Sequence, residues 1–161
     1  MRSLRSLYFL PLQLSSSVRS HRELSDTSRM QTKLVVGSVI AILLFDLGAS
    51  LASRSFGFPY ARASIGSFLI YFAIGFATAR TAAANPIRTA ATVAMITGVA
   101  EASLGWAISW YVGPGRLSSA TPMTVERWIR TAVLVAGIAA GIGALGGLAG
   151  RTTLSINSHA T

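Results

Sequence analysis

Two carboxyl side chains, Asp46 and Glu101, are the residues of this chain with the clearest capacity for chemistry. Each interrupts a long apolar run. Asp46 lies 13 positions after Lys33, and Glu101 lies 13 positions after Arg88. An ionisable side chain inside an apolar membrane segment is costly, so it is a candidate functional residue. Such a carboxyl can bind a proton or a cation, and it can hydrogen-bond between helices.

The residues that share a helical face with these acids are small or polar. Thr97 lies four positions before Glu101, and Ser50 lies four positions after Asp46. Tyr71, in the middle of a separate apolar run, can donate a hydrogen bond to either carboxyl. We therefore expect both acids to point into a helical bundle at similar depth, where Tyr71, Thr97 and Ser50 complete a proton, ion or packing site. Because no Lys or Arg lies at that depth, we expect both acids to be protonated at neutral pH.

Two interpretations of this acidic pair follow. In the first, the protein has a structural, accessory or otherwise unknown role, and the protonated acids join helices through hydrogen bonds, each worth about 0.6 kcal/mol in a membrane. In the second, the protein is an oligomeric proton- or cation-coupled transporter of small solutes that uses Asp46 and Glu101 as its binding site. The two differ in whether both acids meet at one interior site.

Several other kinds of chemistry are disfavoured by the residues that the chain lacks. It has no cysteine, and its two histidines, His21 and His159, lie in polar ends, so we expect no metal ion and no cofactor. No G-x-S-x-G, H-E-x-x-H or P-loop pattern occurs, so we expect no catalytic residues and no enzyme activity. The basic residues are scattered along the chain, which disfavours nucleic acid as a partner.

The apolar runs that contain the acids predict the fold. Hydrophobic residues make up 52% of the chain and charged residues only 12%, where a typical soluble domain has about 25% charged residues. Four charge-poor runs predict helices over about 34–53, 63–79, 89–112 and 129–150. A helix of about 20 apolar residues crosses a bilayer. We therefore expect an all-α membrane protein, a four-helix transmembrane bundle with up-down-up-down topology.

The flanking segments differ in composition from the apolar domain, residues 30–151. Residues 1–29 are rich in Arg and Ser, and we expect a disordered basic tail or a wrongly assigned start with translation beginning at Met30. An organellar transit peptide and a short secretory signal are the alternatives for this segment. Residues 152–161 form a polar C-terminal tail.

The distribution of Lys and Arg predicts the orientation in the membrane. With both termini in the cytoplasm, nine of the 14 Lys and Arg residues lie inside and five lie outside, as the positive-inside rule favours. Five of those nine precede Met30, so the signal depends on the N-terminal segment. We expect an integral protein of a bacterial cytoplasmic membrane.

Glycines in the last apolar run predict close helix packing. Small residues repeated every four positions let helix backbones approach one another in a membrane. The pairs with this spacing are Gly137 and Gly141, Gly143 and Gly147, and Gly146 and Gly150. They serve either packing within the chain, which we favour, or a homo-oligomer formed through the fourth helix. The other expected partner is the lipid bilayer.

Overall fold

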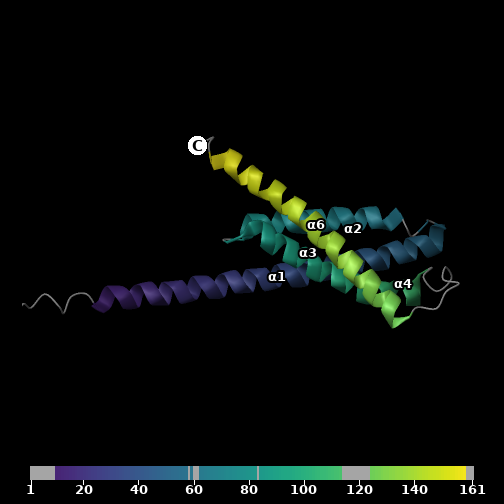
Figure 1. Ribbon diagram of the computed structural model, residues 1–161, viewed down its shortest axis with the longest axis horizontal. Helices are drawn as coiled ribbons and strands as arrows, with labels where there is room; N and C mark the ends of the chain where they lie inside the picture. The colour runs from purple at the N-terminus through teal and green to yellow at the C-terminus, as the bar shows by residue number, and fades with distance from the viewer. Residues whose placement is uncertain (1–9, 58, 60–61, 83, 114–123, 159–161) are drawn as a thin grey trace, which may run out of the picture.

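The computed structural model describes the helical part of the chain. The described residues are 10–57, 59, 62–82, 84–113 and 124–158, with side chains described between Arg29 and Thr152. All regular secondary structure in them is helical (Figure 1). The helices are α1 (Leu10–Phe56), α2 (Ala63–Thr81), α3 (Pro86–Ala100), the π-helical turn η3 (Glu101–Gly105), α4 (Trp106–Val112) and α6 (Val125–Ser158).

Four helical stretches are long and apolar enough to cross a membrane. They are Arg29–Phe56, Ala63–Thr81, Pro86–Val112 and Val125–Thr152, with 28, 19, 27 and 28 residues. At 1.5 Å per residue they are about 28 to 42 Å long, which matches a hydrocarbon core of about 30 Å. The prediction of an all-helical protein with four long apolar helices is therefore confirmed. Each stretch begins or ends a few residues beyond the apolar run that predicted it.

The first helix begins much earlier than its apolar run. For residues 1–29 we expected a disordered basic tail or a wrongly assigned start, and in the structure the backbone is helical from Leu10 onward. This part of α1 projects beyond the other helices (Figure 1). Adding residues to an existing helix avoids the cost of nucleation, and Leu, Arg, Glu and Gln have good helix propensities. Residues 1–9 lie outside the described residues.

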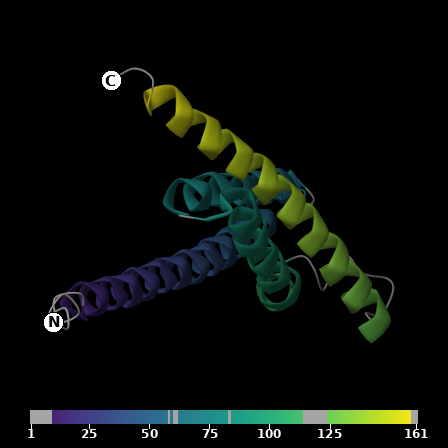
Figure 2. The same cartoon turned by 60° about the vertical axis from the view of Figure 1, so that its left-hand side comes forward.

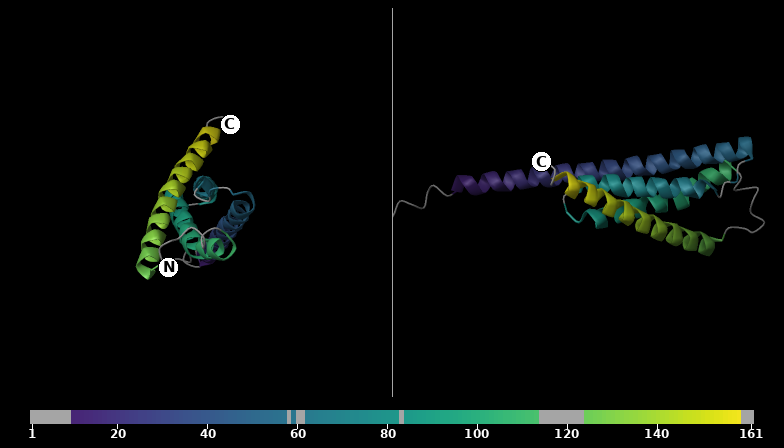
Figure 3. Two further views of the ribbon diagram at one scale, coloured as in Figure 1. Left: turned by 90° about the vertical axis from the view of Figure 1, so that its right-hand side faces the viewer. Right: turned by 90° about the horizontal axis from the view of Figure 1, so that it is seen from above.

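Helices α2 and α3 form the centre of the fold, with α6 on one side and α1 on the other (Figure 3). The described residues of α1 and α6 do not contact each other. Helix α6 crosses the central pair obliquely (Figure 2). Asn85 makes the short connection between α2 and α3 with a left-handed backbone (φ 48°), and Pro86 then begins α3. Asn tolerates this conformation, and proline suits the first position of a helix.

Glycines allow α6 to approach the central pair at the level of the backbone. A Cβ added at Gly75 of α2 would overlap the carbonyl oxygen of Gly143 and lie 2.8 Å from its Cα. One added at Gly150 would lie 2.7 Å from the carbonyl oxygen of Phe76, and one at Gly147 would lie 2.9 Å from the Cβ of Ala90. At these positions the glycines of α6 therefore serve packing within the chain.

The remaining two glycines of the predicted stripe do not. Gly137 and Gly141 are exposed, and a Cβ added at either would meet no described atom within 4 Å. For this pair the described residues offer no neighbour within the chain. The residues of α6 that contact other helices recur every three or four positions, from Ala136 through Gly143 to Gly150, and Gly137 and Gly141 lie on another face of the helix.

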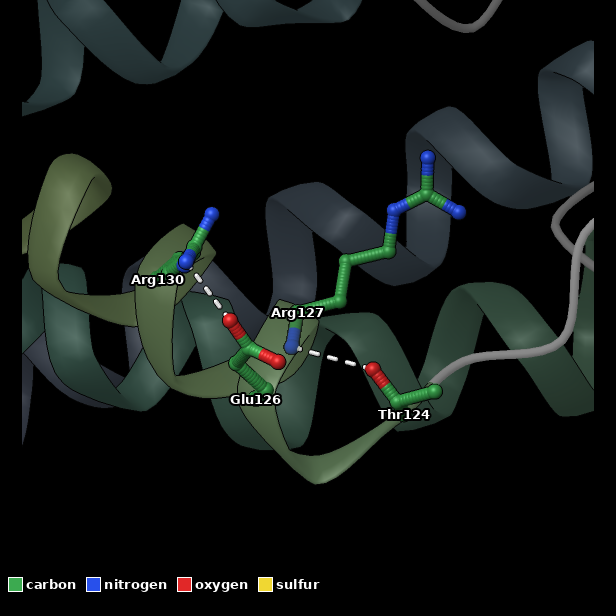
Figure 4. Close-up of polar contacts among 4 residues, drawn as sticks. All are labelled: Thr124, Glu126, Arg127 and Arg130. Carbon is green, nitrogen blue, oxygen red and sulfur yellow. Dashed lines mark hydrogen bonds and ion pairs between the residues drawn. The ribbon is translucent and has the colours of Figure 1, made fainter.

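Side chains at the start of α6 stabilise its first turn (Figure 4). The hydroxyl of Thr124 accepts a hydrogen bond from the backbone N–H of Arg127 at 3.3 Å. Glu126 forms an ion pair with Arg130 one turn later at 2.6 Å. A hydroxyl cap and an acidic residue in the first turn both favour a helix start, although an exposed ion pair contributes little by itself.

Candidate functional site

The helix that carries Glu101 widens at that residue. The backbone N–H of Trp106 donates to the carbonyl of Glu101, five residues earlier, within the turn η3. The hydroxyl of Ser103 donates to the carbonyl of Val99 at 2.6 Å. The predicted helix 89–112 is therefore interrupted by a π-helical turn, which sequence periodicity did not indicate. Single π turns are frequent at functional sites.

A side chain from α6 completes the hydrogen bonding of this turn. The indole N–H of Trp128 donates to the carbonyl of Ala102 at 3.1 Å. A π turn removes the regular hydrogen bonds of a helix, and a carbonyl without a donor is costly in an apolar interior. Trp128 thereby joins α6 to the widened turn. No pattern in the sequence indicated this role for Trp128.

The carboxyl of Glu101 is held by two hydroxyls from α2. Ser67 donates to Oε1 at 2.7 Å, and Tyr71 donates to Oε2. Both donors are buried, with 4% and 1% of their surface exposed. Ser67 was not among the residues singled out in the sequence. Its position four residues before Tyr71, on the same helical face, is a signal that could have identified it.

Asp46 approaches the same point from α1. It is 3% exposed. A Cβ added at Gly105 would overlap its Oδ2 atom and would lie 3.5 Å from Cγ of Glu101. Gly105 therefore provides the space in which the two acids come close to each other. The structure brings Asp46, Glu101, Tyr71 and Ser67 together, and we name these four residues the carboxyl centre.

Thr97 and Ser50 lie on either side of the carboxyl centre. Thr97 is fully buried, and its hydroxyl shares a hydrogen bond of 2.8 Å with the hydroxyl of Ser38 on α1. Ser50 is also fully buried and lies against Gly113. Its hydroxyl makes no hydrogen bond with the described residues. These two residues therefore extend the polar contact between α1 and the α3–η3–α4 helix, and neither touches a carboxyl in a described hydrogen bond.

The polar contact runs in one direction along both helices. Ser38 meets Thr97, Asp46 meets Gly105, and Ser50 meets Gly113. The pairs follow the same order in both helices, so α1 and the α3–η3–α4 helix run in the same direction there.

Two open grooves lie between α1 and α2. The first, of about 420 Å³, includes Lys33, Ser38 and Thr78 in its lining, and the second, of about 550 Å³, includes Phe45 and Gly66. Neither Asp46 nor Glu101 lines either groove. The ring of Phe45 packs on Gly66, and these residues directly precede Asp46 and Ser67 in the chain. The carboxyl centre therefore lies outside both grooves, with Asp46 buried and Glu101 partly exposed.

Comparisons with known proteins do not assign this chain to a class, so its class is inferred from the fold and the site. The chain matches no protein-family model, and neither the curated proteins nor the solved structures contain a match. What the described residues define is a helical protein with four membrane-length apolar helices, a buried Asp46 and a partly buried Glu101. That combination is compatible with a membrane protein.

Replacing Trp128 tests its role in holding the π turn. Trp128→Phe keeps an aromatic ring but removes the donor to Ala102, so we expect a loss of about 1 kcal/mol in the free energy of unfolding. Trp106→Phe is the matched control because Trp106 is 37% exposed, close to the 38% of Trp128, and its indole makes no hydrogen bond with the described residues. Thermal unfolding in detergent, followed by circular dichroism, measures both. Equal losses in the two variants would contradict the assignment.

Proposed function

We propose that this chain is an integral protein of a bacterial cytoplasmic membrane, with its four apolar helices crossing the bilayer in alternating directions and both termini in the cytoplasm. Helix length and hydropathy support insertion. The order of the contacts supports the alternation. Phe45 meets Gly66 across α1 and α2, and Gly98 meets Ala139 while Gly143 meets Ala94 across α3 and α6. We further propose that the role is not enzymatic.

We propose that the carboxyl centre binds and releases a proton, or a small cation in its place, and that this couples to movement of a small solute. The observation that carries the proposal is the convergence of Asp46 and Glu101 at Gly105, with Ser67 and Tyr71 bonded to Glu101. Two close carboxyls in an apolar interior repel each other when both are ionised, so they favour sharing a proton. A cation between them would relieve the same repulsion.

The centre also has the connections that coupling requires. It lies where α1, α2 and the π turn meet, and a change in the protonation of Glu101 alters the hydrogen bonds that join α2 to the π turn. Because Asp46 of α1 is buried, solute access to it requires α1 to move relative to its neighbours. Helices α1 and α2 are separated by open grooves, which leaves room for such movement.

A purely structural role is the second candidate. The hydrogen bonds from Ser67 and Tyr71 to Glu101 join α2 to η3 whether or not a proton ever leaves the site. In this case the acids hold the helices together, as polar side chains do in many membrane proteins. The two functions differ in whether the protonation state changes within the physiological range.

Infrared titration distinguishes these functions without knowledge of the solute. Protein in lipid vesicles is titrated between about pH 5 and pH 9, and the C=O stretching band of protonated carboxyls is followed. The proposal expects one such band, absent from the Glu101→Gln and Asp46→Asn variants, to lose intensity within this range. A constant band across the range would show that the acids serve structure only.

We also propose that the protein forms a homo-oligomer through the open face of α6, because four helices enclose little space for a pathway. Gly137 and Gly141 lie on this face with no described neighbour. We expect Gly141→Ile to convert the oligomer to a monomer, as measured by sedimentation in detergent, because a branched side chain prevents close backbone approach. Leu145→Ile, an exposed apolar residue one turn later, is the control. A monomeric wild-type protein would exclude the oligomer.

A further inference from the structure

The first groove between α1 and α2 has features of a binding site that the carboxyl centre does not use. Its lining comes from Lys33, Leu34, Gly37, Ser38 and Ala41 of α1 and from Ile70, Ala73, Ile74, Ala77 and Thr78 of α2. We propose that this groove, the Lys33 groove, holds one acyl chain of an anionic phospholipid, with the lipid phosphate at Lys33. The proposal is independent of proton coupling at the carboxyl centre.

The dimensions of the Lys33 groove fit a chain within one leaflet. From Lys33 to Ala41 the groove follows α1 for about 12 Å at 1.5 Å per residue. One leaflet of the hydrocarbon core is about 15 Å thick, half of the core. The groove therefore reaches from the charged end of the membrane span almost to the middle of the bilayer. A compact water-soluble ligand would not need an apolar slot of this length.

The charge at the mouth of the groove selects the headgroup. Lys33 lines the groove, and Arg29 lies one turn earlier on α1. Both are exposed, and no acidic residue lines the groove. Basic residues between membrane helices at the interface bind anionic headgroups. A zwitterionic lipid would gain less because its own cation opposes these charges.

The surface that the groove presents is apolar. Ser38 and Thr78, the two hydroxyl residues of the lining, are only 6% and 1% exposed. Ser38 already bonds to Thr97, and the hydroxyl oxygen of Thr78 is enclosed by the protein. The wall below Lys33 therefore suits an acyl chain better than a polar ligand.

Lipid retention measures the proposed site. Wild-type protein is purified from nanodiscs that contain equal amounts of phosphatidylglycerol and phosphatidylcholine, and the retained lipids are counted by native mass spectrometry. We expect phosphatidylglycerol to be retained preferentially. Lys33→Gln should reduce that preference about fivefold, since one basic residue near an anionic surface contributes about that factor. Arg62→Gln, which removes the same charge at the second groove, should leave the preference unchanged.

Filling the groove tests the place of the acyl chain. Ala73 and Ala77 line the groove and are exposed, so Ala73→Phe and Ala77→Ile fill it without displacing packed neighbours. Both variants should lose the bound lipid while unfolding at the temperature of the wild type. Equal retention of the two lipids by the wild type, equal effects of Lys33→Gln and Arg62→Gln, or lipid retained in both filled variants would each overturn the proposal.

Discussion

Gly75→Ala is expected to lower the free energy of unfolding by about 2 kcal/mol, because the added methyl group has no space between α2 and α6. It would overlap the carbonyl oxygen of Gly143 and lie 2.8 Å from its Cα. Both atoms belong to a helix backbone, so no side-chain rotation can relieve the overlap. The two helices must separate, which also weakens the neighbouring contact of Gly150 with Phe76.

The control for this prediction is a glycine in open space. A Cβ added at Gly48 of α1 meets nothing within 4 Å. Gly48→Ala is therefore expected to leave stability unchanged or to raise it by up to about 1 kcal/mol, the difference in helix propensity measured in water. Unfolding of both variants in mixed micelles, followed by circular dichroism, gives the comparison. A similar shift in both variants would show that close packing at Gly75 does not limit stability.

Glu101→Gln is expected to abolish proton-coupled solute movement while the protein still folds. The amide keeps the size of the side chain, and its oxygen can accept from one of the two hydroxyls, Ser67 or Tyr71, while its N–H donates to the other, but it cannot exchange a proton in the relevant range. We expect its free energy of unfolding to lie within about 1 kcal/mol of that of the wild type. Asp46→Asn should have the same effect on movement if the two acids share one proton.

The measurement uses vesicles with a trapped pH-sensitive dye and an imposed pH gradient. Sodium, potassium and methylammonium serve as probes of solute-driven proton flux. Glu126→Gln is the matched control, because it makes the same chemical change at an exposed acid in the first turn of α6, away from the carboxyl centre. Proton flux in Glu101→Gln equal to that of the wild type would contradict coupling at the carboxyl centre.

A third substitution at the same position measures the structural role alone. Glu101→Leu removes the acceptor of two buried hydroxyls, those of Ser67 and Tyr71. We expect a loss of about 1 to 2 kcal/mol relative to Glu101→Gln, because each hydroxyl must find another partner. Stability and proton movement are thus separated at one residue: glutamine tests the proton, and leucine tests the hydrogen bonds.

The sequence by itself determined the elements of this protein. A long run of apolar residues is typical of a segment that crosses a membrane, where the backbone groups must hydrogen-bond within a helix. Four apolar helices therefore followed from the composition and the spacing of the charges alone. The same spacing placed Asp46 and Glu101 at similar depth on helices one and three. Their small and polar neighbours predicted that they point inward.

Only the tertiary structure decided which residues meet. A helical repeat gives the face of each helix but not its rotation against a neighbour, so neither the close approach of Asp46 to Gly105 nor the bond from Ser67 to Glu101 followed from the sequence. The glycines of α6 were alike in spacing, yet the rotation of the helix against its neighbours packs Gly143 and leaves Gly137 open. The π turn is also a tertiary outcome, because its freed carbonyl depends on an indole from α6.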